Sequence, residues 1–136
     1  RYEEINLIVR GGNYGWSARE GRERFAGGVP ASVKFEEPIW VYFRDQGISV
    51  TGGIFYHGDR YPELKGKYIF GDYAHGRIWA LDPDGDKPVS KERVKQIAAM
   101  PEPVSFGRDP GNGDVLISPL TVTVYRLVPN PGPGAK

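Results

Sequence analysis

Short apolar runs separated by glycine and proline are the main feature of this chain. The first run predicts a strand over Ile5–Val9 and ends at Gly11-Gly12. Residues 17–37 are polar and predict a long irregular excursion, after which Pro38–Phe43 returns as a compact aromatic strand or edge. Runs of this length, bounded by turn residues, are typical of strands rather than helices. The pattern therefore predicts an all-β protein.

The middle of the chain repeats this pattern four times at short intervals. Strands are predicted at Ser49–His57, Lys67–Phe70, the segment HGRIWALD (75–82) and Arg93–Met100, with a turn at Pro62–Gly66. The pair Gly52-Gly53 lies inside the first strand, which indicates a bulge or the close approach of another backbone. Propensity alone would also allow a helix over KERVKQIAAM, but the four-strand rhythm and the short length favour a strand. We expect residues 48–100 to form one four-stranded antiparallel meander.

A second, incomplete unit follows Pro101. It has predicted strands at 104–106, 115–118 and Thr121–Val128, and DPGNGD at 109–114 forms a hairpin connection with the turn signal Asn112-Gly113. Repeated four-stranded meanders are typical of β-propeller blades. About two blades cannot close a ring, so this unit would leave sheet edges exposed. We predict one domain over residues 1–128 and a Pro/Gly-rich tail over residues 129–136.

Composition narrows the class of protein further. The formal net charge is +1, from 18 basic and 17 acidic side chains, which argues against nucleic-acid or membrane-surface partners because these need a one-signed patch. Cysteine is absent, so disulfides and thiolate chemistry are excluded. No apolar run is long enough to span a bilayer, and no signal peptide is present. The chain begins at Arg1 rather than methionine, which indicates either removal of a leader or a fragment.

Two segments together resemble a known family. The stretches EEINLIVRGGNYGW (3–16) and GGIFYHGDRYPELKGKYIFGDYAHGRIWALD (52–82) resemble the glucose/sorbosone dehydrogenases. These are pyrroloquinoline-quinone-dependent sugar dehydrogenases built as six-bladed β-propellers, with Hedgehog-interacting-protein-like relatives. The resemblance covers residues 2–128 and matches the C-terminal third of a complete family member. It implies a partial six-bladed propeller and a periplasmic or secreted protein.

The resemblance also implies a calcium site near the start of the chain. Its ligands would be Glu4 and Tyr14, the latter through its backbone carbonyl, and Glu20 is a weaker candidate. The chemistry agrees, because Ca²⁺ prefers hard oxygen donors and a glycine-flanked turn can aim carbonyls inward. The simpler alternative is that Glu3 and Glu4 form a solvated strand end. The acids of DPDGDKP (82–88) do not fit an EF-hand loop, since its sixth and twelfth positions are Lys87 and Arg93.

The same resemblance gives less support to catalysis. The family's histidine base lies on an early blade that has no counterpart here, and neither His57 nor His75 falls on its position. Where basic residues hold the quinone in close relatives, this chain has Ala74-His75 and Glu102-Pro103-Val104. Both departures argue against quinone binding, because the cofactor is anionic and needs cationic partners. Arg77 and Arg108 are nearby in sequence and could substitute, but the favoured interpretation is that they are ordinary surface or blade-edge arginines.

Two functions remain open from the sequence. The first is part of a sugar dehydrogenase with a structural calcium ion, which turns over no sugar by itself. The second is a non-catalytic propeller segment that serves as a binding or assembly module. In both, the exposed sheet edges predict that the chain pairs with other copies of itself or docks onto the rest of its own propeller.

Overall fold

The structure, a computed structural model, describes residues 1–128 and consists of strands and two short 3₁₀ turns. The predicted tail, residues 129–136, lies outside the described residues. The first part of the chain contains β1 (Tyr2–Ile5), β2 (Arg19–Glu20), β3 (Glu23–Arg24) and β4 (Trp40–Phe43). The middle part contains β5 (Val50–Phe55), η1 (Pro62–Leu64), β6 (Tyr68–Asp72), β7 (Arg77–Leu81), η2 (Lys91–Arg93) and β8 (Val94–Ala99). The last part contains β9 (Pro103–Arg108), β10 (Val115–Pro119) and β11 (Tyr125–Arg126). The prediction of an all-β fold is confirmed.

The central sheet is the predicted four-stranded meander, in the order β5-β6-β7-β8. Every neighbouring pair is antiparallel. The register shifts between Thr51 and Gly53, where the glycine pair forms the predicted bulge. A side chain at Gly53 would lie 2.7 Å from the Ile69 carbonyl oxygen on β6, so the backbones approach there as expected. KERVKQIAAM contains η2 followed by β8, which confirms the strand and excludes the helix.

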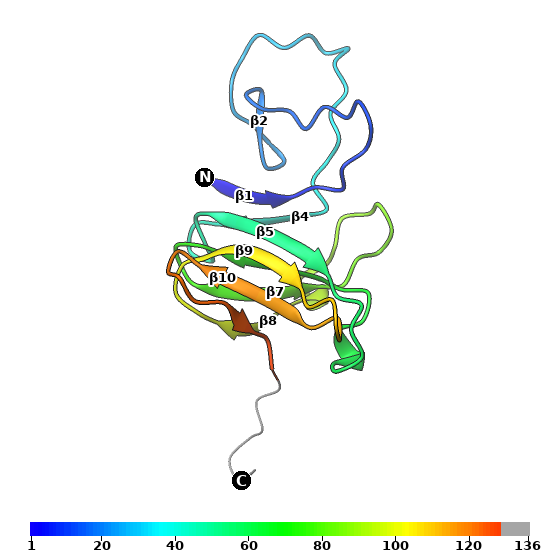
Figure 1. Cartoon of the computed structure of the whole chain (residues 1–136). Helices are drawn as coiled ribbons and strands as arrows, with labels where there is room; N and C mark the ends of the chain where they lie inside the picture. Colours follow the sequence, from blue (N-terminus) through cyan, green and yellow to red (C-terminus); the bar gives the residue numbers. More distant parts are fainter. Residues whose placement is uncertain (129–136) are drawn as a thin grey trace.

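Two smaller sheets pack on the two faces of this meander, as Figure 1 shows. On one face lies the two-stranded sheet β1-β4, and on the other lies the three-stranded sheet β11-β10-β9. The sheets are stacked face to face like successive propeller blades, which is consistent with a partial propeller. The pair β1-β4 adds a third layer to the two units that the sequence predicts.

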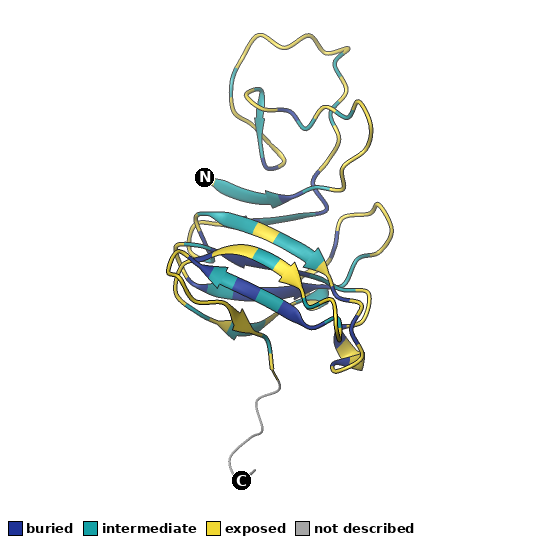
Figure 2. Ribbon diagram, in the orientation of Figure 1, coloured by how far each residue is buried: buried dark blue, intermediate teal, exposed yellow. Residues whose placement is uncertain are grey.

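Each face of the meander has its own hydrophobic core. Strand alternation sends Phe70, Trp79 and Leu81 to the β1-β4 side, where they pack with Ile5, Ile39 and Tyr42. It sends Ile69, Ile78 and Ala80 to the other side, where they pack with Val115 and Ile117 of β10. The central sheet is therefore the most buried layer, and the excursion 6–39 is largely exposed (Figure 2).

Two predicted strands are wrong in their extent. The first strand covers Tyr2–Ile5 rather than Ile5–Val9, because its pairing with β4 ends at Ile5 opposite Trp40. Beyond that point the Tyr14 hydroxyl accepts the Val9 N–H at 2.6 Å and donates to the Leu7 carbonyl at 3.1 Å, so a side chain replaces a strand partner.

The last strand covers only Tyr125–Arg126 rather than Thr121–Val128. Tyr125 pairs with Ile117, so the chain must reverse direction between β10 and β11. The alternating segment that the sequence offers as a strand is therefore partly the turn of a hairpin. Its apolar residues Leu120, Val122 and Val124 are exposed.

An ion-pair network fastens the three-stranded sheet to the central one. Asp114, a buried residue, accepts two hydrogen bonds from Arg60 Nε, at 2.9 and 3.0 Å, and one from Arg126 Nη1 at 2.8 Å. Arg60 follows β5, whereas Arg126 lies on β11 and also pairs with Asp109 at 2.6 Å. The guanidinium of Arg126, and after it that of Arg60, hold the pKa of the Asp114 carboxyl below its ordinary value.

This network predicts a loss of stability in acid. Because folding lowers the pKa of Asp114, its stabilising effect is fully present above the unfolded-state pKa of about 3.9 and disappears as the pH falls through that value towards the folded one. We expect Asp114→Asn to reduce the difference in unfolding free energy between pH 6 and pH 3, measured by urea denaturation. Asp59→Asn, at a carboxylate with 92% of its side chain exposed, is the control and should keep the wild-type pH dependence. Equal pH dependence in wild type and Asp114→Asn would contradict this assignment.

Candidate metal site

The two faces of β1 have different roles. Glu3 and Ile5 point towards the central sheet, where Ile5 is buried and Glu3 Oε2 accepts the backbone N–H of Val50 at 2.8 Å. Tyr2 and Glu4 lie on the other face by strand alternation, towards the excursion. Glu3 therefore joins β1 to the start of β5, and it is not a merely solvated strand end. Glu4 remains as the acid available for a ligand.

Asn6 is the nearest polar partner of Glu4. Its Nδ2 donates to Glu4 Oε1 at 3.3 Å, and both side chains are half-buried. Within residues 1–128 the Asn6 Oδ1 atom is buried without a hydrogen-bond partner. A buried oxygen that lacks a donor is rare in folded proteins. The amide nitrogen of Asn6 faces the Glu4 carboxylate, and carboxylate and amide oxygens are both ligands that Ca²⁺ accepts.

Tyr14, the second predicted ligand, lies in the loop that follows β1. Its hydroxyl holds the Leu7–Val9 segment by the two hydrogen bonds described above, and it packs against Gly12. The side chain is therefore engaged in fixing the loop, and only the backbone carbonyl is left as a possible metal donor. The side-chain contacts of Tyr14 and Glu4 go to different partners, so the structure does not join them directly.

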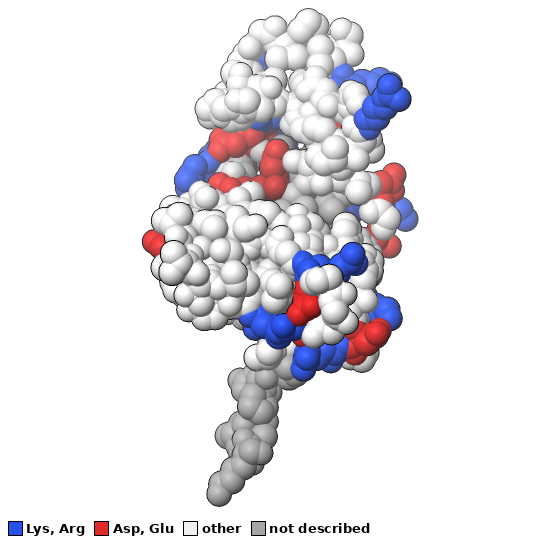
Figure 3. All heavy atoms as spheres, in the orientation of Figure 1, with Lys and Arg blue, Asp and Glu red and all other residues white. Residues whose placement is uncertain are grey.

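Glu20, the weaker candidate, lies on β2 and belongs to a separate hollow. Its Oε1 accepts the Tyr2 N–H at 3.2 Å. The hollow has a volume of about 690 Å³ and is bordered by the stacked rings of Trp16 and Phe25, whose centroids are 5.2 Å apart. Figure 3 shows acidic side chains gathered where this excursion meets the body of the molecule. Within the part of the chain that the structure describes, no group of three or more His, Asp or Glu side chains forms a metal cluster.

Sequence reasoning missed Asn6, although a signal was present. Glu4, Ile5 and Asn6 follow one another, so an apolar residue separates two oxygen-bearing side chains. On an extended backbone, alternate residues share a face. This spacing alone would have placed Glu4 and Asn6 together.

A buried carboxylate, Asp72, organises the neighbouring loops. It is fully buried and accepts three hydrogen bonds: from the Tyr42 hydroxyl at 3.0 Å, from the Ser49 N–H at 2.8 Å and from the His75 N–H at 2.9 Å. Burial, and after it the charge of Asp72, raise the pKa of the Tyr42 hydroxyl well above its ordinary value. Tyr42 therefore stays protonated and donates at all physiological pH values.

The residues considered for catalysis and quinone binding have structural or exposed positions. His57 is exposed and its ring stacks on Phe55, whereas His75 uses its backbone to cap Asp72. Arg77 Nη1 donates to the Gln46 carbonyl at 2.7 Å, so this guanidinium holds the loop before β5. Arg108 is exposed at the end of β9.

The fold and these motifs define a propeller-type protein, and comparison with known proteins identifies its family. The model of the glucose/sorbosone dehydrogenase family matches residues 1–104. The HIPL1 protein of Arabidopsis thaliana is 36% identical in an alignment of 125 residues that covers 81% of this chain and 18% of that protein. The chain belongs to the glucose/sorbosone dehydrogenase family.

Two bacterial proteins are also similar to the chain. The aldose sugar dehydrogenase YliI of Escherichia coli K12 is 26% identical over 98 residues, covering 68% of this chain and 26% of that protein. The uncharacterized protein slr1608 of Synechocystis is 27% identical over 114 residues, covering 79% and 27%. The chain thus spans between 18% and 27% of the length of these three relatives. Within residues 1–128, no helix is both long and apolar enough to cross a membrane.

The cradle around Asp72 predicts the effect of a single methyl group. A side chain at Gly47 would overlap the Asp72 carboxylate and lie 2.8 Å from Tyr42 Cε2. We expect Gly47→Ala to lower the free energy of unfolding by about 1–3 kcal/mol, measured by chemical denaturation. Gly27→Ala is the matched control, since nothing lies within 4 Å of a side chain there. If Gly47→Ala lowers the free energy of unfolding no more than Gly27→Ala does, the stability does not depend on the present position of the Asp72 carboxylate.

Proposed function

We propose that the chain forms blades of a sugar dehydrogenase-type propeller and contributes a structural calcium site to it. The observation that carries the proposal is the stack of three antiparallel sheets in a chain of this family. The name of one relative, an aldose sugar dehydrogenase, supports the substrate class. By the same reasoning, the intact protein acts on sugars and is periplasmic or secreted.

The residues around Glu4 fit a calcium ion. Glu4 supplies a carboxylate, Asn6 supplies the buried oxygen without a donor, and the loop of Tyr14 supplies backbone carbonyls. The ion would neutralise Glu4 and fix the loop to β1. Glu3 is not part of this donor set, because it is hydrogen-bonded to β5.

The residues present fit pyrroloquinoline quinone less well than they fit a calcium ion. An anionic cofactor needs cationic groups that are free to bind it, whereas Arg77 is already bonded to Gln46. Ala74 and Glu102 offer no positive charge where the family's clamps are expected. In the proposed function, binding the quinone and abstracting the proton belong to other blades, and this chain supports them structurally.

A binding or assembly module is the second candidate function. It is favoured by the exposed apolar residues of the β10–β11 turn, where Leu120, Val122 and Val124 are 65%, 105% and 62% exposed. Surfaces of this kind are usually covered by a partner. The partner is the rest of the chain's own propeller or another copy of the chain.

Calcium titration tests the metal site. Ca²⁺ should raise the stability of the chain by mass action, by about 2.7 kcal/mol at a hundredfold excess over Kd, followed by thermal unfolding. Glu4→Gln should abolish this gain, and Asn6→Ala should reduce it. Glu3→Gln is the control: it should lower stability because it weakens the bond to Val50, but the gain with Ca²⁺ should persist. An unchanged gain in Glu4→Gln would refute Glu4 as the ligand.

Sedimentation tests whether another copy of the chain covers the exposed apolar residues of the β10–β11 turn. At low micromolar concentration we expect species heavier than the 15.1 kDa chain, and replacement of Leu120, Val122 and Val124 by serine should shift them towards the monomer. Ile8→Ser, at an apolar residue that is 75% exposed elsewhere, is the control. A single 15.1 kDa species with a cooperative melt would contradict self-association.

A further inference from the structure

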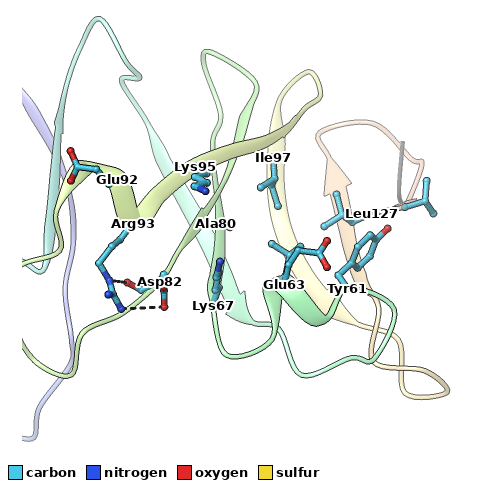
Figure 4. A pocket seen from close by; sticks show the side chains of 12 residues that line it. Tyr61, Glu63, Lys67, Ala80, Asp82, Glu92, Arg93, Lys95, Ile97 and Leu127 are labelled. Atoms are coloured by element: carbon cyan, nitrogen blue, oxygen red, sulfur yellow. Dashed lines mark hydrogen bonds and ion pairs between the residues drawn. The ribbon is translucent and has the colours of Figure 1, made fainter. Parts of the chain in front are cut away.

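The hollows of this molecule differ in the charges of their walls. The cavity shown in Figure 4 lies beside β8 and has a volume of about 430 Å³. Its charged wall residues are three acids and three bases: Glu63, Asp82, Glu92, Lys67, Arg93 and Lys95. Because these charges balance, the wall of this cavity does not select the charge of a ligand.

A second hollow, within the excursion, has charges of one sign. Its volume is about 500 Å³, within the range of small-molecule sites. The wall contains three arginines, Arg19 on β2, Arg22 in the turn and Arg24 on β3. The other lining residues are alanines, valines, a proline and Phe35, so among residues 1–128 no acidic side chain borders this hollow. We call it the arginine hollow.

The β2–β3 hairpin places like charges opposite each other. Arg19 pairs with Arg24 and Glu20 pairs with Glu23 across the two strands. Like charges directly opposite each other on an antiparallel pair are destabilising. The acidic pair is compensated within the chain, because Arg1 contacts Glu20 through its amino group and Glu23 through its guanidinium, the latter at 3.1 Å.

Arg19 is the member of the basic pair that has an acidic partner. Its Nη1 contacts Glu37 Oε1 at 2.5 Å. The guanidinium also lies 5.3 Å from the centroid of the Phe35 ring, which lines the arginine hollow. Glu37 therefore neutralises one of the three arginines and leaves the other two.

Arg22 and Arg24 keep their positive charges. Arg22 Nη2 donates to the neutral Pro38 carbonyl at 3.0 Å, and its other N–H groups are still available to a ligand. Arg24 lies between the arginine hollow and the hollow of Glu20. Among residues 1–128, neither Arg22 nor Arg24 makes an ion pair. The arginine hollow thus carries two uncompensated charges.

We propose that the arginine hollow binds the phosphate group of a small phosphate monoester. Such a group carries a charge of about −1.5 to −2 at pH 7, which matches the two uncompensated guanidiniums, whereas a carboxylate or a sulfate ester would leave one of them unpaired. Guanidinium N–H groups make charge-assisted and often bidentate hydrogen bonds to phosphate oxygens. The bound anion also relieves the repulsion between Arg19 and Arg24. The site uses neither the calcium nor the sugar chemistry proposed above.

Two probes of the same shape test the charge of the ligand, by NMR titration of the 136-residue chain at constant ionic strength. We expect methyl phosphate at pH 7.5 to shift the backbone amide signals of Arg22, Arg24 and Phe35 in a saturable way. Methyl sulfate has a single charge and should bind about tenfold more weakly. At pH 5 the phosphate ester, with a second pKa of about 6, loses a charge and should bind no better than methyl sulfate, whose own affinity should not change. Equal affinity of the two probes at pH 7.5, or shifts confined to other residues, would overturn the proposal.

Substitution of single arginines tests the location of the site. Arg22→Gln and Arg24→Gln should each weaken methyl phosphate about tenfold. Arg10→Gln is the matched control, because Arg10 is an exposed arginine outside the wall of the arginine hollow, and it should leave the affinity unchanged. If Arg10→Gln weakens methyl phosphate as much as the other two do, the chain attracts anions only through its general charge and the proposal is wrong.

Two readouts separate binding from a structural role. Without phosphate, Arg24→Gln should raise the melting temperature because it removes the like-charge pair with Arg19, and methyl phosphate should stabilise this variant less than it stabilises the wild type. Glu37→Gln frees the Arg19 guanidinium and should tighten methyl phosphate several-fold, whereas Glu36→Gln, at the neighbouring exposed acid, should have a smaller effect. A lower melting temperature of Arg24→Gln without phosphate, or an unchanged affinity in Glu37→Gln, would contradict the proposal.

Discussion

The packing of the first two layers depends on one buried carboxylate. Asp72 ends β6 and receives hydrogen bonds from β4, from the loop before β5 and from its own turn, through Tyr42, Ser49 and His75. Each donor would lose about 1–3 kcal/mol if it were buried without a partner. The carboxylate can lie there only because Gly47 has no side chain. The Asp72 carboxylate therefore ties β4 and the loop before β5 to the end of β6.

Apolar burial on both faces of the meander also stabilises the stack. Phe70 and Trp79 face one neighbour, Ile69 and Ile78 face the other, and all four are buried. Polar groups then fix the layers laterally: Glu3 joins β1 to β5, and Asp114 joins the β9–β10 loop to Arg60 and Arg126. The central sheet packs against a neighbouring sheet on each of its two faces. Each outer sheet has such a neighbour on one face only, and apolar residues of the β10–β11 turn remain exposed.

The two candidate sites differ in how the structure presents them. The Glu4–Asn6 pair lies at the end of an edge strand, where a cation would complete an existing set of oxygen atoms. The arginine hollow lies within the excursion, where the β2–β3 hairpin sets Arg19 and Arg24 opposite each other.

The sequence by itself determined the strand order of the central meander, the bulge at Gly52-Gly53 and the family, because these depend on alternation, glycine placement and local motifs that are all contained in contiguous segments. It did not determine where β1 and β11 end, since a strand continues only as far as its partner does, and those partners are β4 and β10. Nor did it reveal the role of Asp72, the separation of Glu3 from Glu4, or the arginine hollow. Each of these depends on residues far apart in the chain, which only the packing of the sheets brings together.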